Sequence, residues 1–439
     1  MSARNVTGWA TVFAISALLT SPKALADPIS DGTAMSVRYC GVGFLGRDAD
    51  KQKNYRYLSN SVLKDKKNIA SISPVLLSVS QNANPKLKVS NANNGSNNYS
   101  LSYIVAAEKF EQQPYIYPIT HKKRYNNIYT VIINTVVFDL QNSQIIGIYP
   151  WVYQFNEASD AQLSELEITK RFADFFRKPE AVAGSDDPSP DYMLAAWAKS
   201  VGGLSLSTKM KTISAAPVTF SADATSALNS TATHGGTPQI STLSRNLTTQ
   251  YEAILSQNFA LPIVPSGAGD QFVASIPNCV GQGDVSLRLP MPAYRFGFEV
   301  EQLKTATVTH SVKRGPSGGG GTVDQNEVGY GARVRVTVLQ SDELDTVNGG
   351  KTVLDNRVRL TSSKTFVGNR EFIDSAQYEK LLVNLMSQTV NNFNNPQEKW
   401  LKDHLSAEES KTKASAVRAA WTKLFKEKIG SPILSQGSK

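Results

Sequence analysis

The sequence is poor in the residues that most often hold metals or act as nucleophiles. Among its 439 residues are two cysteines, Cys40 and Cys279, and four histidines. No two histidines lie three to five residues apart, so the ligand spacing of a zinc site is absent. The phosphate-loop pattern G-x-x-x-x-G-K-[ST] is missing as well. The sequence therefore predicts no catalytic, cofactor-binding or metal-binding residue, and no cofactor.

Long apolar segments are also lacking, apart from one near the N-terminus. The apolar run at residues 9–19 is too short for an ordinary membrane-spanning helix. It follows the cationic Arg4 and precedes the A-x-A sequence that ends at Ala26. These features are typical of a signal peptide that is cleaved after Ala26. We therefore expect a mature protein that starts at Asp27 and is exported to the periplasm or secreted.

Export would bring the two cysteines into a compartment where disulfides persist. A bond between Cys40 and Cys279 would connect the two halves of the chain. The alternative is two separately buried thiols, because sequence spacing alone does not show that two cysteines meet.

Acidic residues are outnumbered by basic ones. The chain has 37 Asp and Glu against 46 Lys and Arg, which gives a formal net charge of +9. The basic excess is spread along the chain, and the motifs of common RNA- and DNA-binding modules are absent. This distribution favours weak attraction to anionic surfaces, and we expect no nucleic-acid partner.

Two stretches share a pattern of strands followed by an amphipathic helix. In the first, strands over residues 131–140 and 145–155 are split by a polar turn, and a helix is expected with Asp160 as its N-cap and Pro179 beyond its end. In the second, strands over 294–303, 332–340 and 353–360 precede a helical stripe that begins at Tyr378 and ends before Pro396. The common order suggests a structural repeat, although α+β proteins without a duplication could share it.

Alternation within the second stretch predicts which side chains face the core. Val334, Val336 and Val338 recur at every second position, with Arg333 and Arg335 between them. Successive strand residues point to opposite faces, so we expect the valines to be buried and the arginines to face solvent.

These patterns predict an α+β fold with two similar modules, each a mixed or antiparallel sheet with an amphipathic helix packed on it. A C-terminal helix follows the second module. The expected organisation is a signal peptide at 1–26, a first module at 27–180, a linker with a short helix at 181–240, a second module at 241–400 and the basic C-terminal helix and tail at 401–439.

The C-terminal helix carries an apolar stripe of Val417, Trp421, Leu424 and Phe425 between lysines and arginines. Docking of this stripe on its own chain is the simpler interpretation. Contact with a partner protein, or peripheral contact with a membrane, is the alternative.

The first hairpin, with its turn sequence FDLQNSQIIG at residues 138–147, and the helix after it resemble small α+β domains of bacterial envelope assembly proteins. Similar domains occur at the N-terminus of the translocation protein TolB, in the curli-secretion protein CsgG and in the flagellar assembly protein FlgT. The chain departs from CsgG in having no lipidated cysteine at the expected mature N-terminus, and from TolB in showing no propeller repeats. The resemblance implies envelope assembly or scaffolding and transfers no catalytic residue.

Together, these observations favour an exported, non-enzymatic binding or scaffold component whose partners are other envelope proteins. Two alternatives come from other classes. An enzyme acting on an envelope polymer would need two close carboxylates in a cleft, and a soluble carrier of an apolar ligand would need a large closed apolar pocket.

Overall fold

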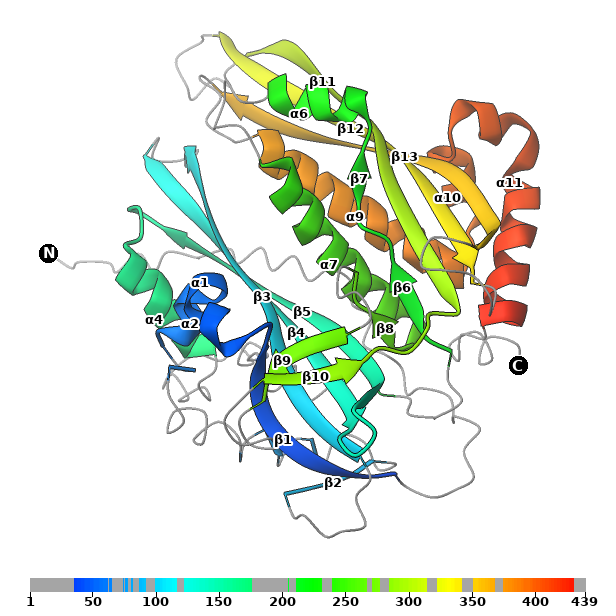
Figure 1. The fold of residues 1–439 in the computed structure, drawn as a ribbon. Coiled ribbons are helices and arrows are strands. Elements are labelled where there is room, and N and C mark those ends of the chain that lie inside the picture. Colours follow the sequence, from blue (N-terminus) through cyan, green and yellow to red (C-terminus); the bar gives the residue numbers. More distant parts are fainter. Residues whose placement is uncertain are drawn as a thin grey trace, which may run out of the picture.

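The computed structural model shows an α+β protein built on two β-sheets (Figure 1). It describes residues 35–61, 63–64, 99–116, 122–175, 211–230, 239–266, 271–276, 284–313, 322–341, 350–367 and 374–429, with Leu204 and parts of 74–91. The expected signal peptide and Cys279 lie outside the described residues.

The first sheet, called sheet A, contains seven strands in the order β2-β1-β3-β4-β5-β10-β9. Its strands are β1 (Met35–Leu45), β2 (Leu87–Ser90), β3 (Tyr99–Ile116), β4 (Lys123–Asp139), β5 (Gln144–Ser159), β9 (Gln271–Ser275) and β10 (Asp284–Arg288). Strands β3, β4 and β5 form an antiparallel meander, and β1 runs parallel to β3. Beside them lie the short helices η1 (Asp48–Asp50), α1 (Lys51–Asn54) and α2 (Arg56–Ser59), and the longer α4 (Glu165–Phe175).

The second sheet, called sheet B, has the order β13-β12-β11-β6-β8, with β7 paired to β11. Its strands are β6 (Ile213–Ala215), β7 (Thr219–Phe220), β8 (Ile263–Val264), β11 (Tyr294–Lys313), β12 (Thr322–Gln340) and β13 (Lys351–Val367). Its helices are α6 (Ala222–Ser230), α7 (Ile240–Phe259), α9 (Asp374–Asn394), α10 (Glu398–His404), α11 (Ala407–Lys423) and the π-helical turn η4 (Leu424–Ile429). In both sheets one strand lies parallel to the first strand of a three-stranded antiparallel meander, and a helix follows the meander.

Sheet membership does not follow the residue ranges expected from the sequence. The β9–β10 hairpin falls within the expected second module, yet it pairs with β1 and β5 of sheet A. Because β9 pairs with β1, the hairpin connects the two ends of sheet A. It covers an apolar cluster that includes Cys40, Ile104 and Phe138. Gly43 permits this approach, because a Cβ atom there would lie 2.3 Å from the carbonyl oxygen of Ser275. Residues 211–230 of the expected linker likewise add β6, β7 and α6 to sheet B.

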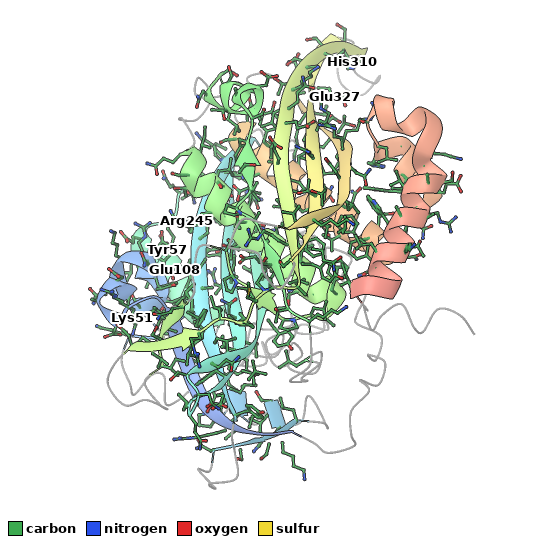
Figure 2. The ribbon with its side chains drawn as sticks, turned by 45° about the vertical axis from the view of Figure 1, so that its right-hand side comes forward. Lys51, Tyr57, Glu108, Arg245, His310 and Glu327 are labelled. Carbon is green, nitrogen blue, oxygen red and sulfur yellow. The ribbon has the colours of Figure 1, made fainter. Side chains whose placement is uncertain are left out.

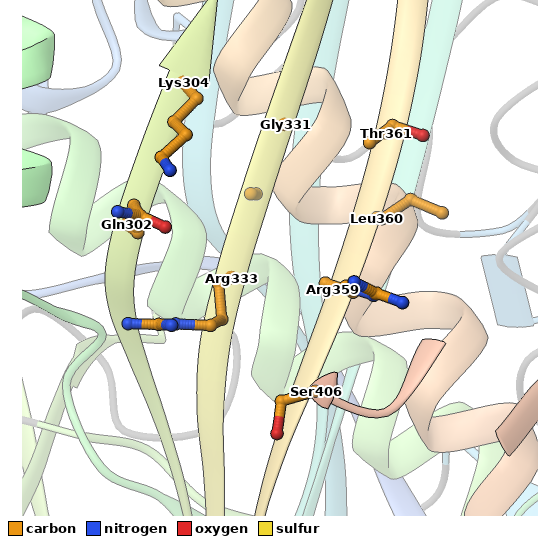
Figure 3. Close-up of a pocket in the computed structure, with 9 residues that line it drawn as sticks. Gln302, Lys304, Gly331, Arg333, Arg359, Leu360, Thr361 and Ser406 are labelled. Carbon is orange, nitrogen blue, oxygen red and sulfur yellow. The ribbon is translucent and has the colours of Figure 1, made fainter. Parts of the chain in front are cut away.

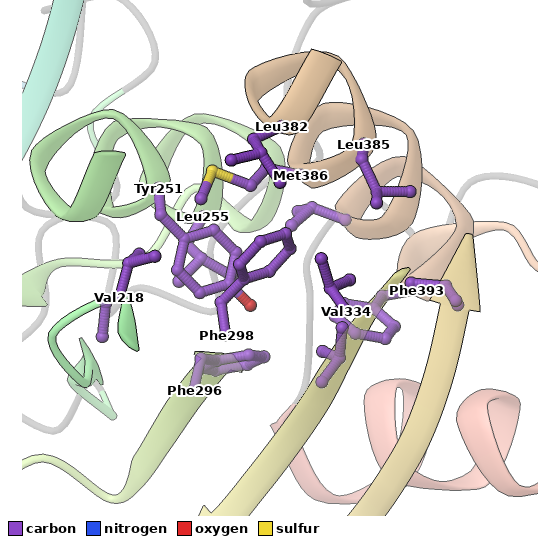
Figure 4. Packing of buried hydrophobic residues seen from close by; sticks show 14 of the residues in the cluster. Val218, Tyr251, Leu255, Phe296, Phe298, Val334, Leu382, Leu385, Met386 and Phe393 are labelled. Atoms are coloured by element: carbon purple, nitrogen blue, oxygen red, sulfur yellow. The ribbon is translucent and has the colours of Figure 1, made fainter. Parts of the chain in front are cut away.

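The main core lies between sheet B and its helices. Helices α7 and α9 run side by side across one face of the sheet, and α7 also contacts β5 of sheet A (Figure 1). Figure 4 shows Tyr251 and Leu255 from α7 and Met386 from α9 packed against Phe298 and Val334 of the strands. Burying such side chains contributes about 1.5–3 kcal/mol each, so this layer supplies much of the stability.

The expected alternation in β12 is confirmed. Val334, Val336 and Val338 are completely buried, while Arg333 and Arg335 lie on the opposite face with 44% and 39% of their side chains exposed.

The expected helix start at Asp160 is wrong by several residues. Helix α4 begins at Glu165, and Ser164 caps it. The Ser164 hydroxyl accepts a hydrogen bond from the Glu167 backbone N–H, and the Glu167 carboxylate accepts one from the Ser164 backbone N–H. This reciprocal pair is a capping box. Asp160 instead forms an ion pair with Arg124 of β4.

We predict that Val336→Lys strongly destabilises the protein, because a buried, unpaired ammonium costs several kcal/mol. Val308→Lys is the matched control. Val308 is 50% exposed in the same sheet, and its cross-strand neighbour is Glu327, which favours a cation. Urea unfolding of both variants measures the difference, and equal losses would contradict the assigned faces.

Candidate functional site

The face of sheet B opposite to the helices carries a ladder of charged side chains. Two pairs of arginines lie directly opposite each other on β12 and β13, namely Arg333 with Arg359 and Arg335 with Arg357. Like charges in such positions repel unless anions separate them. The carboxylates around each pair therefore decide how much positive charge remains.

The pair of Arg335 and Arg357 is compensated. Arg335 donates two hydrogen bonds to Asp355, of 2.8 and 2.6 Å, and lies 3.9 Å from Glu299. Arg357 donates from Nε to Glu301 over 2.8 Å. The hydrogen bond from Arg335 is the main reason that the pKa of Asp355 is lowered, so this row stays ionised at neutral pH.

The pair of Arg333 and Arg359 is not compensated in the same way. Arg333 shares Glu301 with Arg357, at 3.0 Å from the second carboxylate oxygen. Within the described part of the chain, Arg359 and the nearby Lys304 form no ion pair. The two arginine pairs and Lys304 together are five cations, and the carboxylates beside them are Glu299, Glu301 and Asp355, so the excess lies at the end occupied by Lys304 and Arg359.

A cavity of about 260 Å³ lies at this basic end. Figure 3 shows its lining side chains on three adjacent strands, with Lys304 and Gln302 on β11, Arg333 on β12 and Arg359 on β13. The remaining lining residues are Gly331, Ala332, Leu360, Thr361 and Ser406. Because Gly331 lies between Lys304 and Thr361 in the register, no side chain projects from β12 at that point. The lining contains three cations and no carboxylate.

Ser406 also lines this cavity and belongs to a different element. Its backbone N–H donates to the carbonyl of Arg357, and the preceding Leu405 bridges to Val358 on the outer edge of β13. Ser406 is the N-cap residue of α11, yet its side chain makes no capping hydrogen bond. The residue is 6% exposed, and its hydroxyl oxygen is buried without a hydrogen-bond partner. A buried hydroxyl without a partner is costly, and this oxygen has no surface that a molecule in the cavity could touch.

The geometry suits the binding of an anion. The guanidinium groups of Arg333 and Arg359, the Lys304 ammonium and the Gln302 amide are hydrogen-bond donors, and the cations favour negative charge. The lining side chains provide no histidine, cysteine or carboxylate for proton transfer or covalent catalysis.

Two buried carboxyl groups elsewhere have strongly raised pKa values. Burial raises the pKa of Glu108 to about 7, and its carboxylate accepts hydrogen bonds of 2.8 and 2.9 Å from the backbone N–H groups of Tyr57 and Leu58 in α2 (Figure 2). Burial likewise raises the pKa of Glu252 on α7 to about 7, and its carboxylate accepts from the backbone N–H of Ser266. Both groups satisfy local backbone donors, and neither lines the cavity.

A third buried carboxylate joins the two sheets. Lys109 on β3 donates to both oxygens of Glu379 on α9, at 2.7 and 2.8 Å, and also pairs with Glu111. Gln250 on α7 lies 3.5 Å from the same carboxylate. The pKa of Glu379 is raised chiefly by burial, with Lys109 opposing the shift. This cluster fixes β3 against the paired helices, and we assign it a structural role.

The residues that the sequence singled out do not form a site together. Cys40 is completely buried in the cluster under the β9–β10 hairpin, and its thiol is not free. Its pairing with Cys279 stays a prediction, because Cys279 lies outside the described residues. The cavity, by contrast, was not predicted from the sequence.

The apolar stripe of the C-terminal helix is buried in the main core. Trp421 and Phe425 are completely buried, Leu424 is 4% exposed and Val417 is 7% exposed. The Trp421 indole N–H donates to the side-chain oxygen of Asn356 on β13 over 2.9 Å, and Phe425 stacks on Phe393. These side chains dock on their own chain, so contact with a partner would use other residues of the helix.

Other kinds of site find little support in the structure. The described residues contain no cluster of three or more histidine, cysteine, aspartate or glutamate side chains able to hold a metal. Among the helices in the ranges given above, none has both the length and the apolar character needed to cross a bilayer. No family model matches the chain, and no curated protein is detectably similar to it. The likeness to envelope assembly domains therefore stays a hypothesis from the sequence.

We predict that Trp421→Ala lowers the free energy of unfolding by about 3–5 kcal/mol, because it removes a fully buried side chain and a hydrogen bond to Asn356. Arg418→Ala on the same helix, which is 54% exposed, should cost less than about 1 kcal/mol. Thermal and urea unfolding compare the two variants. An unchanged stability of the tryptophan variant would show that this helix does not dock on the core.

A pH effect follows from Glu252. Its pKa is raised from 4.5 to about 7 in the folded state, so the folded protein binds more protons than the unfolded chain between these values. Stability should therefore fall as pH rises from about 5 to 8, by roughly 3 kcal/mol from this group alone. Glu252→Gln keeps an acceptor for Ser266 and should remove that part of the fall. The control, Glu165→Gln at a 70% exposed carboxylate, should leave the slope unchanged.

Proposed function

We propose that this protein is an exported component of the bacterial envelope that acts by non-covalent binding, as an assembly or scaffold protein whose partners are other envelope components. The observation that carries the proposal is the donor set of the cavity on sheet B. Its lining includes three cations, the Gln302 amide and the Thr361 hydroxyl, and it contains no histidine, cysteine or carboxylate. Such a lining favours binding of a negatively charged group.

The arrangement of the two sheets supports a scaffold role. Each sheet is covered by helices, and the α7–α9 layer and the Lys109–Glu379 ion pair hold sheet A against sheet B. A surface on such a body is presented in a fixed geometry, which lowers the entropic cost of binding. Localisation in the periplasm, or secretion from the cell, rests on the N-terminal sequence, as does cleavage after Ala26.

The alternative of a polymer-cleaving enzyme gains no support from the buried carboxyl groups. Glu108 and Glu252 are held by backbone N–H groups in different elements, whereas a glycosidase mechanism needs two carboxyl groups that face one substrate bond. A carrier of an apolar ligand would need a large closed pocket, whereas the cavity on sheet B is partly open to solvent.

Export is testable through the expected cleavage site. Expressed in a bacterial host, the protein should appear in the periplasmic or secreted fraction with Asp27 as its first residue by mass spectrometry. Ala26→Leu should block cleavage, because the processing site needs a small residue there, whereas Leu25→Val should not. Protein with an intact Met1 in the cytoplasm would contradict the proposal.

A further inference from the structure

We propose that the outer edge of β13 at residues 361–365 is a self-association surface, on which a second copy of this chain adds its own β13 to form an antiparallel, two-fold symmetric dimer. The inference goes beyond the proposed function, since it names a second copy of the chain as a partner. It rests on three features of β13, which are the extent of its covering, the direction of its backbone groups and the residues that antiparallel pairing brings together.

The C-terminal segment covers only the first half of β13, which is an edge strand of sheet B (Figure 1). Leu405 bridges to Val358, and the Ser406 N–H donates to the Arg357 carbonyl. Beyond Val358, β13 continues to pair with β12 in an unbroken register. In the described part of the chain no other strand pairs with this second half, and residues 361–365 are exposed. This half is therefore available for pairing with another strand.

The exposed half of β13 has little of the protection that edge strands usually carry. Edges in soluble proteins are commonly shortened, bulged, interrupted by proline or covered by another element. Residues 361–365, with the sequence TSSKT, contain no proline, and the bulge between β12 and β13 lies at the other end of the pair, between Val338 and Leu339. Lys364 is the one charge that opposes pairing. Such an edge suits recognition by strand addition.

The hydrogen bond from Ser406 shows which backbone groups of β13 point outward. The Arg357 carbonyl accepts this bond on the side away from β12. Because backbone groups alternate in direction along a strand, the N–H and C=O groups of Thr361, Ser363 and Thr365 point the same way. An incoming antiparallel strand can exchange a pair of hydrogen bonds with each of these residues.

The sequence of this edge favours a second copy of itself in one register. A two-fold axis at Ser363 places this serine opposite its counterpart and Thr361 opposite Thr365 on each side of the axis. Threonine pairs across strands are favourable. An axis at Lys364 would instead place two lysines directly opposite each other, which is destabilising. An axis closer to Thr361 would bring the second strand against the segment at Leu405.

Charge complementarity supports the same register. Arg359 forms no ion pair among the described residues, and it lies at the covered end of the edge. At the other end Glu327, the neighbour of Thr365 on β12, is 40% exposed and lies 3.8 Å from His310 (Figure 2). With the axis at Ser363, strand spacings put the Cα atoms of Arg359 and the other copy's Glu327 about 12 Å apart on one face. Extended arginine and glutamate side chains can bridge this distance, so each copy supplies a carboxylate to the other.

Sedimentation equilibrium of the purified protein over a range of concentrations tests for the dimer. The mass should rise with concentration from that of one chain to twice that value. Ser363→Pro removes an outward N–H and keeps the bonds to β12, because proline is tolerated on the open side of an edge strand. It should weaken dimerisation at least tenfold. The control, Ser363→Ala, keeps the N–H and should change the dissociation constant less than twofold.

Charge reversal distinguishes a contact between copies from a change within one copy. Arg359→Glu and Glu327→Arg should each weaken the dimer several-fold, because each brings like charges together across the axis. The double variant restores an opposite pair and should recover most of the loss. Within one copy the two residues are far apart along the strands, so a recovery must come from contact between copies. Lys351→Glu, at an exposed position on β13 far from the axis, should leave the dimer unchanged.

Disulfide trapping locates the axis. Ser363→Cys should give a covalent dimer under mild oxidation, since the Cα atoms of a hydrogen-bonded antiparallel pair lie about 5.5 Å apart, within the range of a disulfide. Lys351→Cys should stay monomeric on a denaturing gel. A protein that is monomeric at all concentrations would overturn the proposal and leave this edge to a strand from another protein or from elsewhere in the chain. A dimer that is unaffected by Ser363→Pro and by both charge reversals would overturn it as well.

Discussion

The β9–β10 hairpin is the constraint on which the rest of the structure depends. It comes from the second half of the chain, but its apolar side chains Phe272, Ala274 and Val285 cover a face of sheet A that includes Ile104, Val136 and Phe138. Without it, this face would be exposed and β1 would lack its partner β9. The hairpin therefore makes the folding of the two sheets interdependent, and the burial of Cys40 in the same cluster places one cysteine where the two halves of the chain meet.

The two sheets share the order of their strands and helices but differ in what covers the face opposite to the helices. In each, a parallel strand, a three-stranded meander and a helix follow in the same order, with α2 beside α4 in one case and α7 beside α9 in the other. The second face of sheet A is apolar and closed by the hairpin, whereas the corresponding face of sheet B is a charged ladder. The two sheets thus differ in the face turned away from their helices, which is buried in sheet A and exposed in sheet B. Such a division would be expected after a duplication, because only one copy needs to keep an exposed surface.

The sequence predicted the elements in which a local pattern repeats over many residues. The period-two valines of β12 and the stripe of α9 were predicted correctly, because burial of one face imposes that period. Helix α7 was missed, although Leu243, Leu247, Tyr251 and Leu255 recur at every fourth position. The β9–β10 hairpin was not predicted, since its strands are five residues long and the strands that flank the hairpin, β1 and β5, are more than a hundred residues away. The prediction that a helix starts at Asp160 was wrong, because an acidic residue that follows a strand can form an ion pair as readily as it can cap a helix.

The contacts of the arginines beside the cavity depend on a β-bulge in β11, which is visible in the sequence as a break in the alternation of apolar residues. Phe296, Phe298 and Val300 alternate toward the core, but the next buried residue of β11 is Leu303, three positions on. The extra residue is a bulge between Val300 and Gln302, which leaves Glu301 without a partner in the ladder. Its carboxylate, 15% exposed, reaches Arg333 and Arg357 on two different strands. A regular strand would pair each arginine with its own opposite residue, and Glu301 could not serve both. The bulge therefore allows one carboxylate to contact both Arg333 and Arg357, which share its single negative charge.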